Sequence, residues 1–258
     1  MHNGGTVGKP KAGVIFDGTF DGFLTIVHSF YYQKLCPAAI ADESSFQQEL
    51  GLTYTQVTTD HGKAATVAEG FRQKCGPDCF QTLYAGFLHR ESDRLMDLFS
   101  YVIAGFKLGP SIDQKLTWPF VLKTHYYAGN TLREAHLFKG FLRFKNTTSG
   151  VFYAELEPEN HILPLIADHF TDRLMNERWI IYDKKRKLAA VYDTQQWAIY
   201  DAPAGAMAAV SQDEDQFQAL WTAFYEAIAI QERKSDKRQK QMLPLRYRKH
   251  MTEFKSTR

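Results

Sequence analysis

Two kinds of apolar pattern follow one another along the chain, and their order constrains the fold more than any other feature. Between residues 78 and 143 apolar residues recur mostly at helical spacing, as in LHRESDRLMDLFSYVIAGFKLG, which ends at Gly109-Pro110. Beyond this region, short segments such as GVFYAELE alternate between apolar and polar residues. Helices and strands that occupy separate stretches of a chain are typical of an α+β fold.

The second region predicts a β-β-α-β-β order. FLRFKN and GVFYAELE flank a turn at 146–150 and predict a hairpin, and HILPLIADHFTDRLMN predicts a helix. RWIIYD and LAAVYDT predict two more strands, and QWAIYDA resembles a further one. We therefore expect helices packed on an antiparallel sheet.

A short α/β unit is expected near the N-terminus. AGVIFD (12–17) predicts a buried strand, and FDGFLTIVHSFYYQKL predicts the helix after it. YTQVTTD (54–60) predicts a second strand, followed by a helix over 61–74. The fold class is thus α+β: helix-rich, with an antiparallel sheet and a short N-terminal α/β unit.

Charge divides the chain into a body and an arm. Residues 233–258 hold ten Lys or Arg and two acids, a net charge of +8, whereas the remaining residues hold 21 basic and 27 acidic side chains, a net charge of −6. We expect a single domain over 1–232, with two lobes divided near 110–130 as the alternative, and a basic helical arm over 233–258. Such an arm fits a polyanion partner or the acidic body itself.

Composition and termini indicate a cytoplasmic protein without a membrane segment. The chain has 258 residues, 44% of them hydrophobic and 23% charged, as in globular proteins. No apolar run reaches the roughly 18 residues of a spanning helix, and MHNGGTVGKPKAG lacks the apolar stretch of a signal peptide.

No cofactor or metal site is evident in the sequence. Neither G-x-x-x-x-G-K-[ST] nor a G-x-G-x-x-G after a strand occurs. Cys75 and Cys79 form a C-x3-C pair, which would need Cys36 and His61 to complete four zinc ligands. Free thiols are the expected alternative, and no metal site is predicted.

The segment REAHLFKGFLRF (133–144) is the first candidate binding site. On one continuous helix, Arg133, His136, Lys139 and Arg143 would follow one another along a common side. Their cations suit phosphate oxygens, and His136 could act as an acid or a base near neutral pH. The alternative is a solvated helix face with no ligand.

The carboxylates of Asp17 and Glu155 complete the predicted catalytic set with His136. Asp17 lies in FDGTFDGF, directly after a strand, where it could bind a hydroxyl, an amine or a metal, or simply form a tight turn. Glu155 and Glu157 fall two apart on a strand, so they could share a proton or a metal, or lie exposed on a polar sheet face.

A second cationic group lies near the C-terminus. In MLPLRYRKHMTEF, Arg246, Arg248 and Lys249 flank Tyr247, a mixture that is usual in nucleic-acid contacts because the ring can stack on a base. The same segment could instead form a helix that docks on an acidic surface.

Four segments of the chain resemble one bacterial family in the same order. They are FDGTFDGFLTIV (16–27), TLREAHLFKGFLRF (131–144), EPENHILPLIADHFTDR with WIIYD (157–183), and LPLRYRKHMTEF (243–254). The family is known as probable DNA metabolism proteins, or SAM-coupled metabolism proteins. The resemblance implies a radical-SAM partner and, through relatives fused to a uracil-DNA-glycosylase-like domain, a role in DNA repair or modification. This chain has neither the glycosylase motifs nor the radical-SAM cysteine triplet, so a partner would supply that chemistry.

Three functions stay open at this point. The first is a protein that binds DNA or a nucleotide and works with the radical-SAM partner. The second is an enzyme that acts on a nucleotide or a damaged base. The third is a protein-interaction scaffold, for which the 14% aromatic content could furnish a surface.

Overall fold

The computed structural model describes residues 12–33, 37–43, 46, 52–146 and 150–202. The chain separates into two compact units. Unit 1 comprises Met1–Leu83 and Glu91–Thr124, and unit 2 comprises Tyr84–Arg90 and His125–Arg258.

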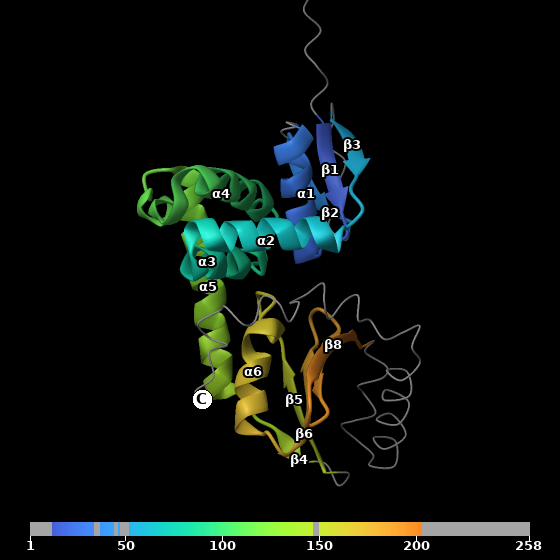
Figure 1. The fold of residues 1–258 in the computed structure, drawn as a ribbon. Helices are drawn as coiled ribbons and strands as arrows, with labels where there is room; N and C mark the ends of the chain where they lie inside the picture. The colour runs from blue at the N-terminus through green and yellow to red at the C-terminus, as the bar shows by residue number, and fades with distance from the viewer. Residues whose placement is uncertain (1–11, 34–36, 44–45, 47–51, 147–149, 203–258) are drawn as a thin grey trace, which may run out of the picture. The chain divides into compact units, whose positions relative to one another are not determined.

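Unit 1 combines a parallel sheet with helices (Figure 1). Its elements are β1 (Ala12–Phe16), α1 (Phe20–Gln33), β2 (Ala39–Asp42), β3 (Thr53–Gln56), α2 (His61–Cys75), most of α3 (Pro77–Phe87), α4 (Arg94–Leu108), the 3-10 helix η1 (Gly109–Gln114) and the first residues of α5 (Pro119–Phe141). The strand order is β2-β1-β3, and β1 is parallel to both neighbours.

The core of unit 1 forms where α1 packs on α2. The buried side chains Phe20, Phe23 and Leu24 lie on α1 at positions that face one side of the helix. Phe20 also meets Phe80 of α3 edge to face, with ring centroids 6.0 Å apart. Because α1 and α2 each follow a strand, this packing holds the two strand-to-helix loops in place.

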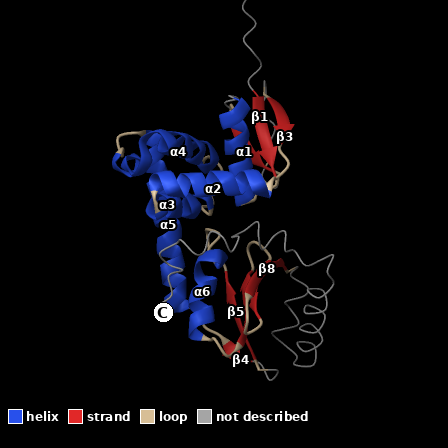
Figure 2. Ribbon diagram, viewed as in Figure 1, coloured by secondary structure: helices blue, strands red, loops and turns tan. Residues whose placement is uncertain are grey.

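Unit 2 consists of the rest of α5 and a five-stranded sheet covered by one helix (Figure 2). Its further elements are β4 (Lys145–Asn146), β5 (Val151–Leu156), α6 (Leu163–Arg173), β6 (Arg178–Asp183), β7 (Leu188–Tyr192) and β8 (Trp197–Asp201). The strand order follows the chain from β4 to β8. All five residues of β7 are buried, as expected for a strand between two others.

The α+β class is confirmed, but the expectation of a purely antiparallel sheet was wrong. β5 and β6 run parallel, whereas the other neighbours are antiparallel. The reason is α6, which returns the chain to the end of the sheet where β5 begins, so that β6 runs in the same direction as β5. The sheet is therefore mixed.

Helix α5 begins earlier than the sequence suggested. Asn130 or Thr131 followed by Glu134 resembles a capping pattern in the sequence, but α5 runs without a break from Pro119. Proline suits the first turn of a helix because its missing N–H has no partner there in any case. The Thr131 hydroxyl is buried and donates to the Tyr127 carbonyl at 3.0 Å, so it caps nothing.

Several smaller predictions can be placed against these elements. Strand β2 was not predicted, because its four residues are too few for a periodic pattern. The predicted basic helical arm over 233–258 lies outside the described residues. Among the helices that are described, none combines the length and apolar character needed to cross a membrane.

Candidate functional site

Asp17 ties together the two loops that leave the parallel sheet in unit 1. Its Oδ1 accepts hydrogen bonds from the Thr19 backbone N–H at 3.1 Å and the Thr19 hydroxyl at 2.6 Å. Its Oδ2 accepts from the Thr59 hydroxyl at 2.8 Å. Thr19 follows β1 and Thr59 follows β3, so this predicted catalytic carboxylate joins the ends of neighbouring strands.

A carboxylate–imidazole pair lies beside Asp17. Asp21 on α1 is wholly buried, and its Oδ2 lies 2.6 Å from His61 Nδ1. The His61 side chain is 41% exposed and opens α2. Because an ionised carboxylate only accepts hydrogen bonds, Nδ1 carries a proton, and in the neutral imidazole Nε2 is then the acceptor. No described residue bonds to Nε2.

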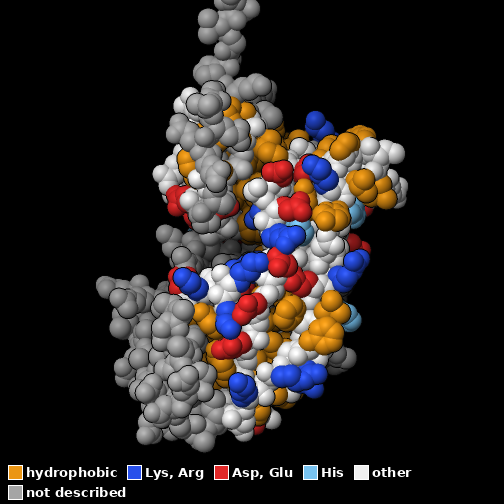
Figure 3. Space-filling model, turned by 180° about the vertical axis from the view of Figure 1, so that it is seen from behind, with side chains coloured by type: hydrophobic (Ala, Val, Ile, Leu, Met, Phe, Trp, Pro, Cys, Tyr) orange, Lys and Arg blue, Asp and Glu red, His pale blue; other side chains and the backbone are white. Residues whose placement is uncertain are grey.

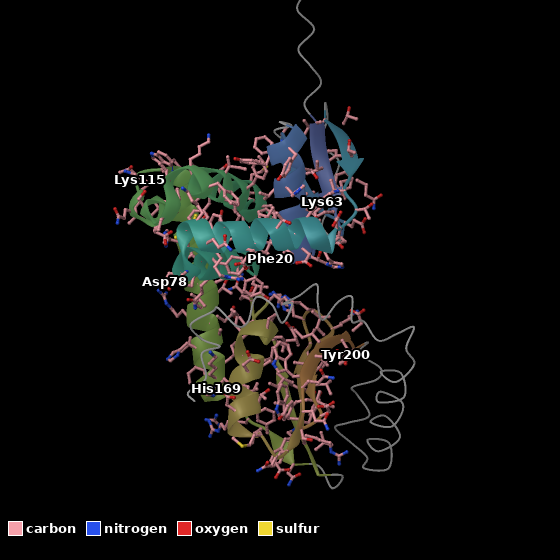
Figure 4. All side chains as sticks on the ribbon, viewed as in Figure 1. Phe20, Lys63, Asp78, Lys115, His169 and Tyr200 are labelled. Atoms are coloured by element: carbon pink, nitrogen blue, oxygen red, sulfur yellow. The ribbon has the colours of Figure 1, made fainter. Side chains whose placement is uncertain are left out.

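The start of α2 is capped by the residue before His61. Asp60 Oδ1 accepts from the backbone N–H groups of Gly62 and Lys63, each at 3.0 Å. The Lys63 backbone N–H, then its ammonium, hold the pKa of Asp60 below its usual value. Figure 4 labels Phe20 and Lys63, which mark the first turns of α1 and α2. The cap fixes where His61 stands.

In unit 2, the outer side of α5 carries two of the predicted residues. Arg133 and His136 are exposed, and among the described residues neither has an ion-pair partner. Leu137 and Phe141, which follow on the same side of the helix, are 46% and 67% exposed. This outer face of α5, defined by these four residues, mixes one fixed cation, one imidazole and apolar surface.

Lys139 does not belong to that face. At 3.6 residues per turn, six residues rotate it about 240° from Arg133. Its charge acts on His169 of α6, which is labelled in Figure 4. Partial burial, then Lys139 and Arg173, lower the pKa of His169. The predicted common stripe was therefore wrong for Lys139.

Arg143 was also misplaced by the sequence analysis, because α5 ends at Phe141. Its guanidinium turns back on the helix end and donates to the carbonyls of Gly140 at 2.7 Å and Leu142 at 3.0 Å. A cation at this position satisfies carbonyls that the helix leaves open. The side chain itself remains exposed.

Glu155, the third predicted catalytic residue, is engaged on its own sheet. Its Oε1 accepts from the Tyr153 hydroxyl at 2.8 Å. The Lys184 ammonium lies 3.6 Å from Glu155 and 2.9 Å from Glu157. The two carboxylates thus share a lysine cation. Asp17 belongs to unit 1, whereas His136 and Glu155 belong to unit 2.

The loop after β5 is held by a carboxylate of α5. Glu134 accepts three hydrogen bonds from it: from the Glu159 N–H at 2.6 Å, the Asn160 N–H at 2.8 Å and the Asn160 side-chain amide at 2.7 Å. Asn160 is buried, and its Oδ1 accepts from the Arg90 N–H at 3.0 Å. Glu134 therefore holds this loop and does not cap a helix start.

The turn after β6 closes the same loop from the other side. Asp183 is wholly buried and accepts from the N–H groups of Lys185 and Arg186. The Arg186 guanidinium binds Asp183 at 3.0 Å, the Pro158 carbonyl at 3.0 Å and the Glu159 carbonyl. Burial raises the pKa of Asp183, and the Arg186 bonds and charge oppose that rise.

Ion pairs complete this network on the surface. Glu159 meets Arg90 at 2.6 Å and Lys185 at 2.8 Å. These two cations hold the pKa of Glu159 below its usual value, with Lys185 the stronger influence. On the face drawn in Figure 3, Lys and Arg side chains lie interspersed with Asp and Glu side chains rather than gathered together.

The two described cysteines of unit 1, Cys75 and Cys79, are buried thiols. Cys79 Sγ donates to Asp113 Oδ2 at 3.2 Å, and the Tyr101 hydroxyl donates to Asp113 Oδ1 at 2.5 Å. Burial, with the Asp113 charge, raises the pKa of Cys75 to about 11 and that of Cys79 to about 12. Within the described ranges, no three His, Cys, Asp or Glu side chains gather as a metal would require. Cys36 lies outside those ranges.

The placement of His61 beside Asp21 was not predicted, although the sequence held a signal for it. His61 was considered only as a zinc ligand. Yet His61 directly follows a predicted strand, as Asp17 does, and the carboxyl ends of parallel strands meet at one edge. The other predicted binding residues, Arg246, Tyr247, Arg248 and Lys249, lie outside the described residues.

Comparison with known proteins places the chain in a family. No curated protein matches the sequence. A domain family described as a domain of unknown function, DUF4130, matches residues 92–253, well over half of the 258-residue chain. The match covers α4, α5 and all of the mixed sheet of unit 2. The chain therefore belongs to the DUF4130 family.

Proposed function

We propose that the protein binds DNA or a nucleotide in DNA repair or modification, and that it works with a radical-SAM partner. The observation that carries the proposal is the outer face of α5, where Arg133 has no carboxylate partner among the described residues. By contrast, Arg90, Lys185 and Arg186 are bound to carboxylates of their own unit. A cation without an internal partner is the one available to phosphate.

The apolar side chains of this face fit the same kind of ligand. Phe141 is 67% exposed, and Tyr126, two turns before Arg133, is 55% exposed. Exposed rings next to a cation are the usual means of binding single-stranded nucleic acid, because every base offers a surface for stacking. The face therefore favours a single strand, or unstacked bases, over an intact duplex.

The family resemblance supports the biological setting of the proposal. Similar proteins accompany a radical-SAM protein, and this chain has none of the cysteine triplet that such chemistry needs. The proposed division of work is that this protein holds the nucleic acid and the partner performs the reaction. The basic residues Arg246, Arg248 and Lys249 would add contacts to the same phosphate backbone.

The test is fluorescence anisotropy with the full chain, a labelled single-stranded oligonucleotide and a matched duplex, over a range of salt concentrations. We expect tighter binding to the single strand, and affinity that falls steeply as salt rises. Arg133→Gln should reduce the slope of log affinity against log salt by about one, since one phosphate contact is lost. Phe141→Ser should weaken binding with little change in slope, because stacking is lost and charge is kept.

The matched control is Lys184→Gln, which removes a cation already shared by Glu155 and Glu157. It should leave both affinity and slope unchanged. If the wild-type protein binds neither oligonucleotide, or if Lys184→Gln acts as strongly as Arg133→Gln, the proposed function is wrong. Copurification with a radical-SAM protein in the absence of nucleic-acid affinity would support the scaffold function instead.

A further inference from the structure

The strand order of unit 1 creates a point where ligands commonly bind. β1 is central, the chain passes from β1 through α1 to β2 on one side, and β3 then pairs on the other side. The loops that follow β1 and β3 therefore lie next to each other at the carboxyl edge of the sheet, where the Thr59 hydroxyl meets Asp17. In open parallel sheets, ligands commonly bind outside the carboxyl ends of the strands.

Hydrogen bonds of Thr25 join the first turns of α1 to the loop before α2. The Thr25 hydroxyl of α1 contacts the carbonyls of Asp21, at 2.7 Å, and Asp60, at 3.2 Å, and lies 3.1 Å from the Asp60 N–H, from which it accepts. Thr25 is 2% exposed, so these bonds are shielded from water. These hydrogen bonds set the distance between Asp21 in the first turn of α1 and His61 at the start of α2.

A glycine allows the first turn of α1 to lie against the Asp17–Thr59 contact. A Cβ added at Gly22 would fall 2.4 Å from Asp17 Oδ1, 2.8 Å from Thr59 Oγ1 and 2.9 Å from Phe16. No side chain larger than glycine fits without a shift. The polar groups at this edge are thus closely built around one another.

The side chains at the carboxyl edge of this sheet favour an uncharged ligand that donates hydrogen bonds. In the neutral imidazole of His61, Nε2 is the acceptor, and the buried Asp21 fixes the orientation of the ring through Nδ1. The carboxylates of Asp17 and Asp60 lie in the same loops, and the cation that a described ion pair ties to them is Lys63, 3.2 Å from Asp60. This excess of acceptors and negative charge suits hydroxyl or amino groups and repels phosphate.

We propose that this edge is a second ligand site, which binds a nucleoside through a ribose hydroxyl or a base amino group donated to His61 Nε2. Asp21 is the positioning residue for that imidazole. The choice of a nucleoside rests on the proposed function, whereas the preference for an uncharged donor follows from the residues of unit 1. The site would then bind a nucleoside more tightly than the corresponding 5′-monophosphate.

The experiment is an NMR titration of the full chain with adenosine and thymidine, each compared with its 5′-monophosphate. Imidazole resonances report the site, and His61→Gln assigns the His61 signals among nine histidines. We expect saturable shifts of the His61 ring with at least one nucleoside below about 5 mM, in the weak range usual for a small ligand. The monophosphates should bind more weakly.

Variants separate the site from the fold. His61→Gln should lower nucleoside affinity about tenfold, measured by saturation-transfer NMR on the ligand, since one hydrogen bond is lost. His28→Gln is the matched control, because this histidine lies on α1 about two turns beyond Asp21 and stacks near Tyr32 with ring centroids 4.4 Å apart. It should leave the affinity unchanged.

Each outcome decides the proposal. Absence of saturable His61 shifts, equal affinity in His61→Gln, or tighter binding of the monophosphates would overturn it. Because oligonucleotide binding is measured separately on the outer face of α5, the nucleoside site can fail while the proposed function stands. Conversely, nucleoside binding without oligonucleotide binding would support a site in unit 1 and reject the role of α5.

Discussion

Both units have polar residues at the carboxyl ends of parallel strands, but they use them differently. In unit 2, the loop after β5 and the turn after β6 form a closed network in which Asp183 meets Arg186 and Glu159 meets Lys185. In unit 1, the loops after β1 and β3 leave His61 Nε2 without a partner among the described residues. A closed network contributes order, whereas an oriented acceptor without a partner is suited to a ligand.

The largest expected effect is on the buried ion pair of unit 2. Arg186→Met should lower the free energy of unfolding by about 3 kcal/mol, because it leaves the wholly buried Asp183 carboxylate without its cation. Two carbonyls of the loop also lose a donor. Urea unfolding of the variant and the wild type measures the difference.

The adjacent lysine provides the control for this measurement. Lys184→Met removes an exposed ion pair of the same turn, and exposed pairs contribute little. It should leave the urea midpoint unchanged. If both variants lose the same free energy of unfolding, the Arg186–Asp183 pair contributes no more than an exposed ion pair. Unit 2 would then not differ from unit 1 by having a closed network.

The second effect concerns the amide that joins this loop to α5. Asn160→Ala should cost about 1–3 kcal/mol, because the buried side chain bonds to Glu134 and to the Arg90 N–H, and both groups would lose a partner. Thermal unfolding monitored by circular dichroism measures the change. Asn130→Ala on α5 is the control and should not destabilise, so an equal loss in both variants would contradict the role given to Asn160.

The sequence predicted the elements better than the sites, for a physical reason. Periodicity is local, so it located β1, α1, α2 and the end of α4 at Gly109. It also identified the β-α-β order of unit 2. It could not give the direction of β6 relative to β5, because the pairing of strands is decided by the crossover helix and its packing, not by the residues of either strand.

The sites depend on residues far apart in the chain. Asp21 and His61 are 40 residues apart, and Glu134 lies 26 residues before Asn160, so no local pattern pairs them. The misplaced Arg143 has another cause. α5 ends at Phe141 with Gly140 still in its last turn, and the sequence there continues the helical spacing. A periodic pattern alone therefore extended the stripe of cations too far.

A third prediction tests how closely unit 1 is built around its ligand edge. Gly22→Ala should destabilise by about 1–3 kcal/mol, because the new methyl group would displace Asp17, Thr59 or Phe16. It should also abolish nucleoside binding if the edge is the site. Differential scanning calorimetry and the NMR titration measure the two effects.

A helical glycine of unit 2 is the matched control. A Cβ added at Gly129 of α5 meets nothing within 4 Å, so Gly129→Ala should stabilise by about 0.5–1 kcal/mol through its better helix propensity. Opposite signs for the two substitutions are expected. If both substitutions stabilise the protein, a methyl group fits at Gly22, and the polar groups at this edge of unit 1 are not in close contact.

The smallest expected effect distinguishes the two ways in which the units lower a carboxyl pKa. Asp60 in unit 1 has its pKa lowered first by the Lys63 backbone N–H, and Glu159 in unit 2 has its pKa lowered by the cations of Lys185 and Arg90. Salt at about 1 M shortens the screening length to about 3 Å and weakens exposed ion pairs more than short backbone hydrogen bonds.

In carbon-13 NMR titrations, the pKa of the Glu159 carboxyl should therefore return toward its ordinary value with added salt, and the pKa of Asp60 should change less. A carboxyl whose pKa is lower in the folded state stabilises the protein at pH values above its unfolded pKa, and this stabilisation is lost as the pH falls through its folded pKa. Added salt should therefore remove the stabilisation from Glu159 and keep that from Asp60. Equal movement of both carboxyls would show that the lysine ammonium, not the helix N–H, dominates at Asp60, and that the two units differ less than their geometry indicates.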